Sequence, residues 1–146
     1  MKLVLQRVAR ASVSVNGNTI ANISRGLLIF FGAEKQDDLE KLQFLADKSL
    51  NLRIFADTQG KMNLSCLDIS AEVLVVSQFT LAGDCSKGRR PGFDNAAPPK
   101  EAEFLYHQFI QKISVAGVSV ATGQFGADMQ VELVNDGPVT FLLSAD

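Results

Sequence analysis

Short stretches of alternating apolar and polar residues dominate the first part of the chain. Residues 3–15 alternate in places, which is typical of a half-buried β-strand. The Asn16-Gly17 pair that follows favours a two-residue hairpin, so residues 19–23 are expected to pair back on the first strand. Residues 27–31 form an apolar run between two glycines and predict a buried strand.

Two later segments have the periodicity of amphipathic helices. Asp37, with Glu40 three residues later, matches a capping box and predicts the start of the first helix. The second helix is expected from about residue 100 to 116, after Pro98-Pro99 and before Gly117. The apolar stripes predicted to face the core are Leu39, Leu42, Leu45, Ala46 and Leu50 in the first helix and Ala102, Leu105, Phe109 and Ile113 in the second.

The remaining apolar segments predict further strands and a fold class. These strands are expected at residues 52–55, 72–79, 118–122, 129–134 and 139–144. Two helices and about seven strands in this order predict an α/β fold of the α+β type: a mixed, largely antiparallel sheet curled toward a barrel. The length of 146 residues fits a single domain, residues 1–146.

Composition and charge narrow the function classes. Hydrophobic residues make up 47% and charged residues 21%, as in ordinary globular proteins. The formal net charge of −2 attracts no nucleic acid globally, so any nucleic-acid contact must come from a local patch, and DNA is not an expected partner. The chain lacks a signal-peptide core and a membrane-spanning apolar run, which predicts a cytoplasmic protein without membrane contact. Cys66 and Cys85 lack metal-site spacing, and neither a metal nor a cofactor is expected.

The segment Ser77-Gln78-Phe79-Thr80 is the first candidate for chemistry. It lies where an apolar strand opens onto a loop, and consecutive free N–H groups there could stabilise an oxyanion on an acyl carbon. Ser77 and Thr80 could donate hydrogen bonds or attack the carbon. The alternative is that these polar residues simply end a strand.

A histidine-based hydrolase is disfavoured. The Gly-x-Ser-x-Gly nucleophile motif is absent, and the single histidine, His107, lies on the second predicted helix beside its core stripe. A hydrolase built this way would act on an already activated bond such as an aminoacyl ester, where orientation and oxyanion stabilisation are enough.

Three further segments each have a functional and a purely structural interpretation. Lys87-Gly88-Arg89-Arg90-Pro91 could contact phosphates or be a solvated loop. Phe125-Gly126-Ala127-Asp128-Met129 could admit a flat ring between two side-chain walls or be a turn with two core residues. Gly137-Pro138 could present two backbone carbonyls to a small cationic group or simply connect the last hairpin, because Asp136-Gly137 is a good turn pair.

Taken together in order, these segments resemble the bacterial-type D-aminoacyl-tRNA deacylases from end to end. Each match is weak alone, but their order along the whole chain makes chance agreement implausible. The matching strings are Gln6-Arg7-Val8, Ala11-Ser12-Val13, Gly60-Lys61-Met62-Asn63, Ser77-Gln78-Phe79-Thr80-Leu81, Lys87-Gly88-Arg89-Arg90-Pro91, Phe125-Gly126-Ala127-Asp128-Met129 and Asn135-Asp136-Gly137-Pro138-Val139-Thr140.

The resemblance implies an activity and a division of roles. It implies hydrolysis of the ester between a D-amino acid, or glycine, and the terminal adenosine of tRNA, by a homodimer without a cofactor. Ser77, Gln78, Phe79 and Thr80 would hold the acyl group around a positioned water, with N–H groups near Phe79 and Thr80 as oxyanion donors. In the partner's site, a cis Gly137-Pro138 pair would reject L side chains.

The resemblance also assigns the remaining candidates. Phe125, Gly126, Ala127 and Met129 would form the adenosine pocket, Arg7 would brace the Gly-Pro turn, and Lys87, Arg89 and Arg90 would supply phosphate contacts. Two competing functions stay open: a non-catalytic RNA-binding module that uses the basic loop, and an esterase for small D-amino-acid esters.

Overall fold

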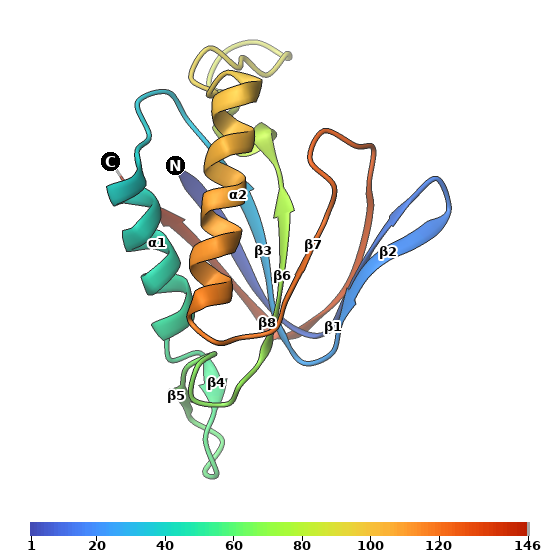
Figure 1. Cartoon of the computed structure of the whole chain (residues 1–146), viewed down its shortest axis with the longest axis vertical. Coiled ribbons are helices and arrows are strands. Elements are labelled where there is room, and N and C mark those ends of the chain that lie inside the picture. The colour runs from blue at the N-terminus through green and yellow to red at the C-terminus, as the bar shows by residue number, and fades with distance from the viewer. Residues whose placement is uncertain (146) are drawn as a thin grey trace.

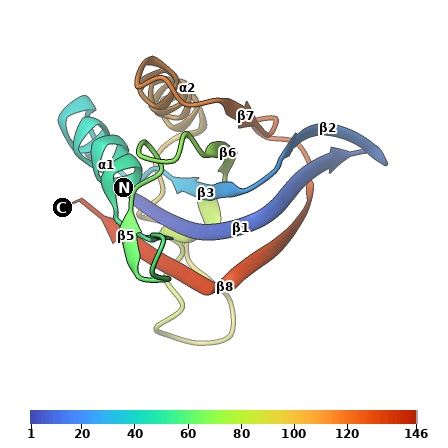
Figure 2. The ribbon, with the colours of Figure 1, turned by 90° about the horizontal axis from the view of Figure 1, so that it is seen from below.

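The fold is a curled mixed sheet with two helices packed on one side, as described by a computed structural model for residues 1–145 (Figures 1 and 2). The sheet order is β2-β1-β3-β6-β7, and β8 pairs with the other edge of β1. Strand β1 is antiparallel to β2, β3 and β8, whereas β3-β6 and β6-β7 are parallel. The sheet strands are β1 Lys2–Val15, β2 Asn18–Ile23, β3 Gly26–Gly32, β6 Glu72–Ser77, β7 Val120–Thr122 and β8 Gln130–Ser144. The predicted fold class is confirmed.

Helices α1 (Leu39–Asn51) and α2 (Pro99–Val115) lie side by side on the sheet (Figure 2). Their buried residues pack with Phe31 and its neighbours, and the Phe31 ring lies 5.1 Å from Phe109. A second apolar cluster fills the opposite, concave face of the sheet, around Val8, Leu28 and Leu74. The two-stranded ribbon β4 (Phe55–Ala56) and β5 (Met62–Leu64) stands apart from the main sheet at one end (Figure 1). In the described part of the chain, neither helix has the length and apolar character needed to span a bilayer.

The start of α1 differs from the prediction. Asp38, not Asp37, is the N-cap, and its carboxylate accepts a hydrogen bond of 2.8 Å from the Lys41 N–H. The Asp37 carboxylate instead accepts from the Met1 amine at 2.6 Å. Because this partner lies far away in sequence, local pattern could not reveal it. Leu39, which the prediction placed in the buried stripe, is the first residue of α1 and is exposed.

Strand β8 differs most from the prediction, which placed a hairpin between residues 129–134 and 139–144. It is one strand that pairs with β1 along its length. The register runs from Val8 opposite Asn135 to Gln6 opposite Thr140, so residues 136–139 bulge out opposite Arg7 alone. Proline cannot donate a ladder hydrogen bond and is found at such bulges. The Gly137-Pro138 peptide bond is cis.

Two shorter strands also have different bounds. A strand was predicted at residues 52–55, but β4 begins at Phe55, so the two overlap at this residue alone. Strand β6 ends at Ser77 rather than residue 79, because the chain turns into a short 3₁₀ helix, η1 (Phe79–Ala82). The Gln78 N–H still donates to the Phe31 carbonyl at 2.7 Å, which fixes the point where this turn leaves the sheet.

Candidate active site

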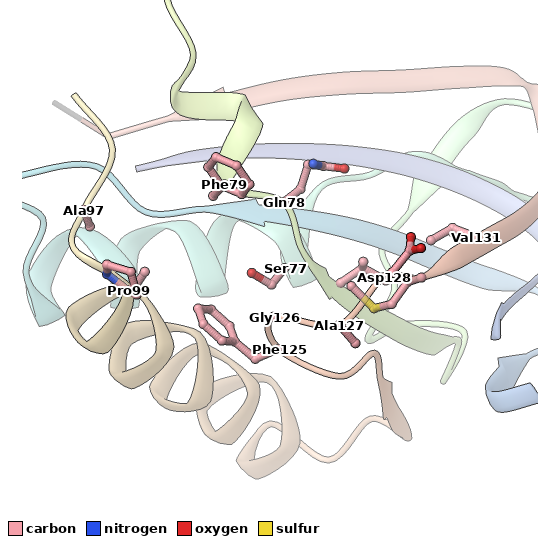
Figure 3. A pocket seen from close by; sticks show the side chains of 13 residues that line it. Ser77, Gln78, Phe79, Ala97, Pro99, Phe125, Gly126, Ala127, Asp128 and Val131 are labelled. Atoms are coloured by element: carbon pink, nitrogen blue, oxygen red, sulfur yellow. The ribbon is translucent and has the colours of Figure 1, made fainter. Parts of the chain in front are cut away.

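A pocket of about 490 Å³ lies where the end of β6, the start of α2 and the loop from β7 to β8 meet (Figure 3). It brings together two candidate segments that are far apart in sequence, residues 77–79 and 125–129. The remaining lining residues are Val76, Ala97, Pro99, Ala102 and Val131. The lining is therefore mainly apolar, as in typical small-molecule sites.

The end of β6 supplies the polar wall of this pocket. The Ser77 hydroxyl points into the same hollow as the Phe125 ring (Figure 3). No carbonyl or side chain of residues 1–145 accepts a hydrogen bond from the N–H groups of Phe79 or Thr80, which begin η1. First-turn N–H groups lack intrahelical partners for geometric reasons. They are available to a ligand.

Thr80 lies at the margin of the pocket rather than in its lining. Its hydroxyl oxygen accepts a hydrogen bond of 2.5 Å from the Gln78 side-chain amide. This contact fixes the two side chains relative to each other and leaves the Thr80 hydroxyl proton free to donate elsewhere.

The facing wall comes from the loop between β7 and β8. The Phe125 ring packs on Tyr106 at 5.8 Å, and the Tyr106 hydroxyl donates to the Val75 carbonyl at 2.9 Å. Burial raises the pKa of Tyr106 further above neutral pH. A Cβ on Gly123 would lie 2.7 Å from the Met129 sulfur, so a larger residue there would push the Met129 side chain away from its place in the wall.

The Gly137-Pro138 bulge does not line this pocket. Arg7 connects the bulge to the segment before β4: its Nε donates to the Asp136 carbonyl at 2.9 Å, and its Nη1 donates to the Ile54 carbonyl at 2.7 Å. Across the base of the bulge, the Asn135 carboxamide accepts from the Val139 N–H at 2.9 Å. Gly137 and Pro138 themselves are exposed. The chain thus presents this dipeptide to solvent on a braced support.

The basic segment lies in an exposed loop, residues 84–92, between η1 and α2. Asp84 and Gly92 close its base with two backbone hydrogen bonds of 2.8 Å. Lys87, Arg89 and Arg90 are exposed and form no salt bridge with any carboxylate of residues 1–145. The structure therefore leaves three cations on one loop without a protein counter-ion.

Sequence reasoning missed several residues of the site. Pro99 and Ala102, from the first turns of α2, line the pocket, and Tyr106 packs against the pocket residue Phe125. The Pro98-Pro99 pair predicted where α2 starts, but it gave no information on which segment lies opposite α2 across the pocket. No linear signal could have paired α2 with the end of β6. Within residues 1–145, no group of three or more potential metal-ligating side chains gathers.

Comparisons with known proteins identify the family. The sequence profile of the family described as D-Tyr-tRNA(Tyr) deacylase matches residues 4–144. D-aminoacyl-tRNA deacylases of Geotalea uraniireducens and Pelobacter propionicus are 59% and 56% identical to the chain, covering 98% of it and 92% and 99% of their own lengths.

Solved structures give the same result for the fold. One titled c-Myc DNA Unwinding Element Binding Protein has a TM-score of 0.95 at 41% identity, covering 100% of this chain and 99% of its own. A probable eukaryotic D-amino acid tRNA deacylase shares the fold with a TM-score of 0.82 at 19% identity, covering 99% and 98%. The chain belongs to the D-Tyr-tRNA(Tyr) deacylase family.

Proposed function

We propose that this chain hydrolyses the ester that joins a D-amino acid to the terminal adenosine of tRNA. The observation that carries the proposal is the pocket that joins unpaired N–H groups at the end of β6 to the recess between Phe125 and Met129. An aminoacyl-adenosine has an acyl carbonyl at one end and a flat base at the other, which matches the two ends of this pocket. Family membership supports the same activity.

The reaction needs no covalent intermediate with the protein. A water attacks the acyl carbon, and the Phe79 and Thr80 N–H groups stabilise the developing oxyanion. The ester oxygen leaves with a proton as the ribose hydroxyl, which frees the D-amino acid and intact tRNA. Ser77 and the paired Gln78 and Thr80 side chains orient the acyl group and the water, aided by the neighbouring hydroxyl of the terminal ribose.

The adenine base would lie between Phe125 and Met129, over the small residues Gly126 and Ala127. Aromatic stacking of unpaired bases is the usual way in which proteins recognise single-stranded RNA ends. Lys87, Arg89 and Arg90 would contact the preceding phosphates. The net charge is −2, so phosphate contacts must be local, and the three exposed cations of this loop would supply them. We propose RNA rather than DNA as the ligand because the related deacylases act on aminoacyl-tRNA.

Stereochemistry would be read by the Gly137-Pro138 bulge of a second copy in a homodimer. Two observations support this: the bulge projects from its own chain without lining its own pocket, and β8 has one free edge. Near that edge Leu142 is 80% exposed, as expected of a surface that another chain covers. Backbone carbonyls from the bulge would hold the substrate's α-amino group and exclude an L side chain, while admitting glycine.

The decisive experiment compares D-tyrosyl-, L-tyrosyl- and glycyl-tRNA as substrates of the purified chain. We expect cleavage of the D-tyrosyl and glycyl esters and not of the L-tyrosyl ester. Binding without hydrolysis would favour an RNA-binding module. Equal cleavage of D-tyrosine methyl ester and D-tyrosyl-adenosine would favour a small-ester hydrolase. We further propose that the whole chain acts as one domain, in the cytoplasm where aminoacyl-tRNA is used.

The cross-subunit site has its own test. Ala127→Trp fills the pocket but keeps the bulge, whereas Gly137→Ala disturbs the bulge but keeps the pocket. Each variant alone should be inactive. Random mixing after denaturation and refolding should restore about one quarter of wild-type activity, since half of the dimers are mixed and each has one complete site. No restoration by mixing would contradict the cross-subunit assignment.

A further inference from the structure

We propose that Phe93 is a positioning residue for the deacylation reaction: its ring holds the turn that carries the Phe79 and Thr80 N–H groups, and it links this turn to the basic loop. The inference rests on the proposed function and deepens it. Phe93 does not line the pocket, so it would act through η1 and not by touching substrate.

The Phe93 ring contacts η1 at both of its ends. At the first residue of η1, the Phe79 and Phe93 ring centroids lie 5.1 Å apart with their planes at 53°. At its far end, Phe93 Cε1 would lie 3.1 Å from a Cβ placed on Gly83, whose N–H donates to the Thr80 carbonyl at 3.0 Å. A side chain at Gly83 would crowd the ring, which would have to move by a few tenths of an ångström. The ring therefore spans the turn that orients both free N–H groups.

The same residue ends the basic loop. The two hydrogen bonds between Asp84 and Gly92 close the loop directly before Phe93, and the Phe93 carbonyl accepts from the Ala96 N–H at 3.0 Å. A movement of the loop would therefore move Phe93, because hydrogen bonds hold the backbone directly before and after this residue. A phosphate held by Lys87, Arg89 or Arg90 would restrain the loop, and the loop would press Phe93 against η1.

A purely structural role does not account for this contact. Phe79 is 56% exposed and Phe93 37% exposed, so both rings lie outside the two buried apolar clusters. An aromatic pair adds about 0.5–1.5 kcal/mol beyond the area that it buries, a small part of the stability of a domain. Loss of this pair should disturb the local turn while leaving the fold intact.

The test measures kcat and KM of Phe93→Ala with D-aminoacyl-tRNA and with D-aminoacyl-adenosine, which has no phosphate. We expect kcat to fall roughly tenfold on both substrates, less than the 10²–10³ seen when an oxyanion donor is lost outright. KM should change less than about twofold, because Phe93 itself does not line the pocket and the Phe125–Met129 wall is unchanged. Phe93→Tyr keeps the ring and should restore kcat. The matched control is Phe44→Ala, which removes an exposed ring on α1 far from η1 in sequence and should act like wild type.

Coupling to the loop is tested by combining Phe93→Ala with glutamine at Lys87, Arg89 and Arg90. If the loop acts through the ring, the combined variant loses no more kcat on tRNA than Phe93→Ala does alone. Losses that multiply would overturn the link. If the wild type is active and a folded Phe93→Ala variant is equally active, this inference is wrong but the proposed function stands. If the wild type is inactive, both the proposed function and this inference are wrong.

Discussion

Replacing Arg7 by alanine should both destabilise the fold and weaken discrimination against L-amino acids. Arg7 ties two distant segments together, since it donates to the carbonyl of Asp136 in the bulge and to that of Ile54 before β4. Its side chain is 13% exposed, and the bond to Ile54 is partly buried, so water cannot readily replace that bond. Removal therefore frees the bulge that we propose as the stereochemical filter.

The size of the effect follows from the two bonds. Hydrogen bonds from charged donors contribute about 1.5–3 kcal/mol each, and the Ile54 carbonyl, in a buried residue, would lose its Arg7 donor. The Asp136 bond is exposed and counts for less, and the 3.8 Å ion pair with its carboxylate adds little. We expect a loss of about 2–3 kcal/mol in unfolding free energy, or a Tm lower by about 4–12 °C.

Urea unfolding at fixed protein concentration measures the stability, and hydrolysis of D- and L-tyrosyl-tRNA measures the discrimination. The matched control is Arg10→Ala on the same strand: Arg10 is exposed and has no side-chain hydrogen bond or ion pair within residues 1–145, so its loss should cost under about 0.5 kcal/mol. If Arg7→Ala matches this control in both assays, Arg7 does not stabilise the bulge and the reasoning is refuted.

Three further predictions concern other parts of the molecule. Phe125→Ala should weaken binding of a non-hydrolysable D-aminoacyl-adenosine about fivefold or more by calorimetry, because stacking on a base contributes about 1–3 kcal/mol; unchanged affinity would remove Phe125 from the site. Gly137→Ala should abolish deacylation with near-wild-type circular dichroism, because φ is +140° and its Cβ would lie 2.7 Å from the Val139 side chain; an active variant would contradict this. Unfolding free energy should fall as pH drops below about 4.5. Burial raises the pKa of Glu34, but the Met1 amine and Lys2 outweigh burial and lower this pKa below 4.5, while backbone hydrogen bonding lowers the pKa of Asp68 below 3.8. As the pH falls, these carboxylates therefore bind protons in the unfolded chain before they do so in the folded chain, which favours unfolding. A urea series whose unfolding free energy stays constant from pH 7 to 3 would refute this prediction.

Local sequence rules predicted the elements whose causes are local. The Asn16-Gly17 turn has the positive φ angles of 50° and 78° that the pair allows, and the stripe of α2 is buried as its spacing requires. Here each residue is placed by neighbours within a few positions. The prediction needed no knowledge of the rest of the chain.

The errors arose where distant residues decide the structure. Asp37 fits a capping box, but the Met1 amine occupies its carboxylate. Residues 136–139 look like a hairpin turn, but pairing of β8 with β1 on both sides turns them into a bulge. The linear pattern has no means of separating a turn that reverses the chain from a bulge that does not, since both favour Asp, Gly and Pro.

That distinction has a functional consequence. A hairpin turn would have placed Gly137-Pro138 beyond the end of two paired strands, whereas the bulge places it partway along β8, whose one partner in the described sheet is β1. Within one copy, the pocket has N–H donors but is not lined by Gly137 or Pro138, and the exposed Gly137-Pro138 pair lies outside the pocket. In the two-fold pair that we propose, these two surfaces would complement each other, because each copy would give one bulge and receive one. The position of the bulge along β8 is therefore an argument for the proposed self-complementary dimer.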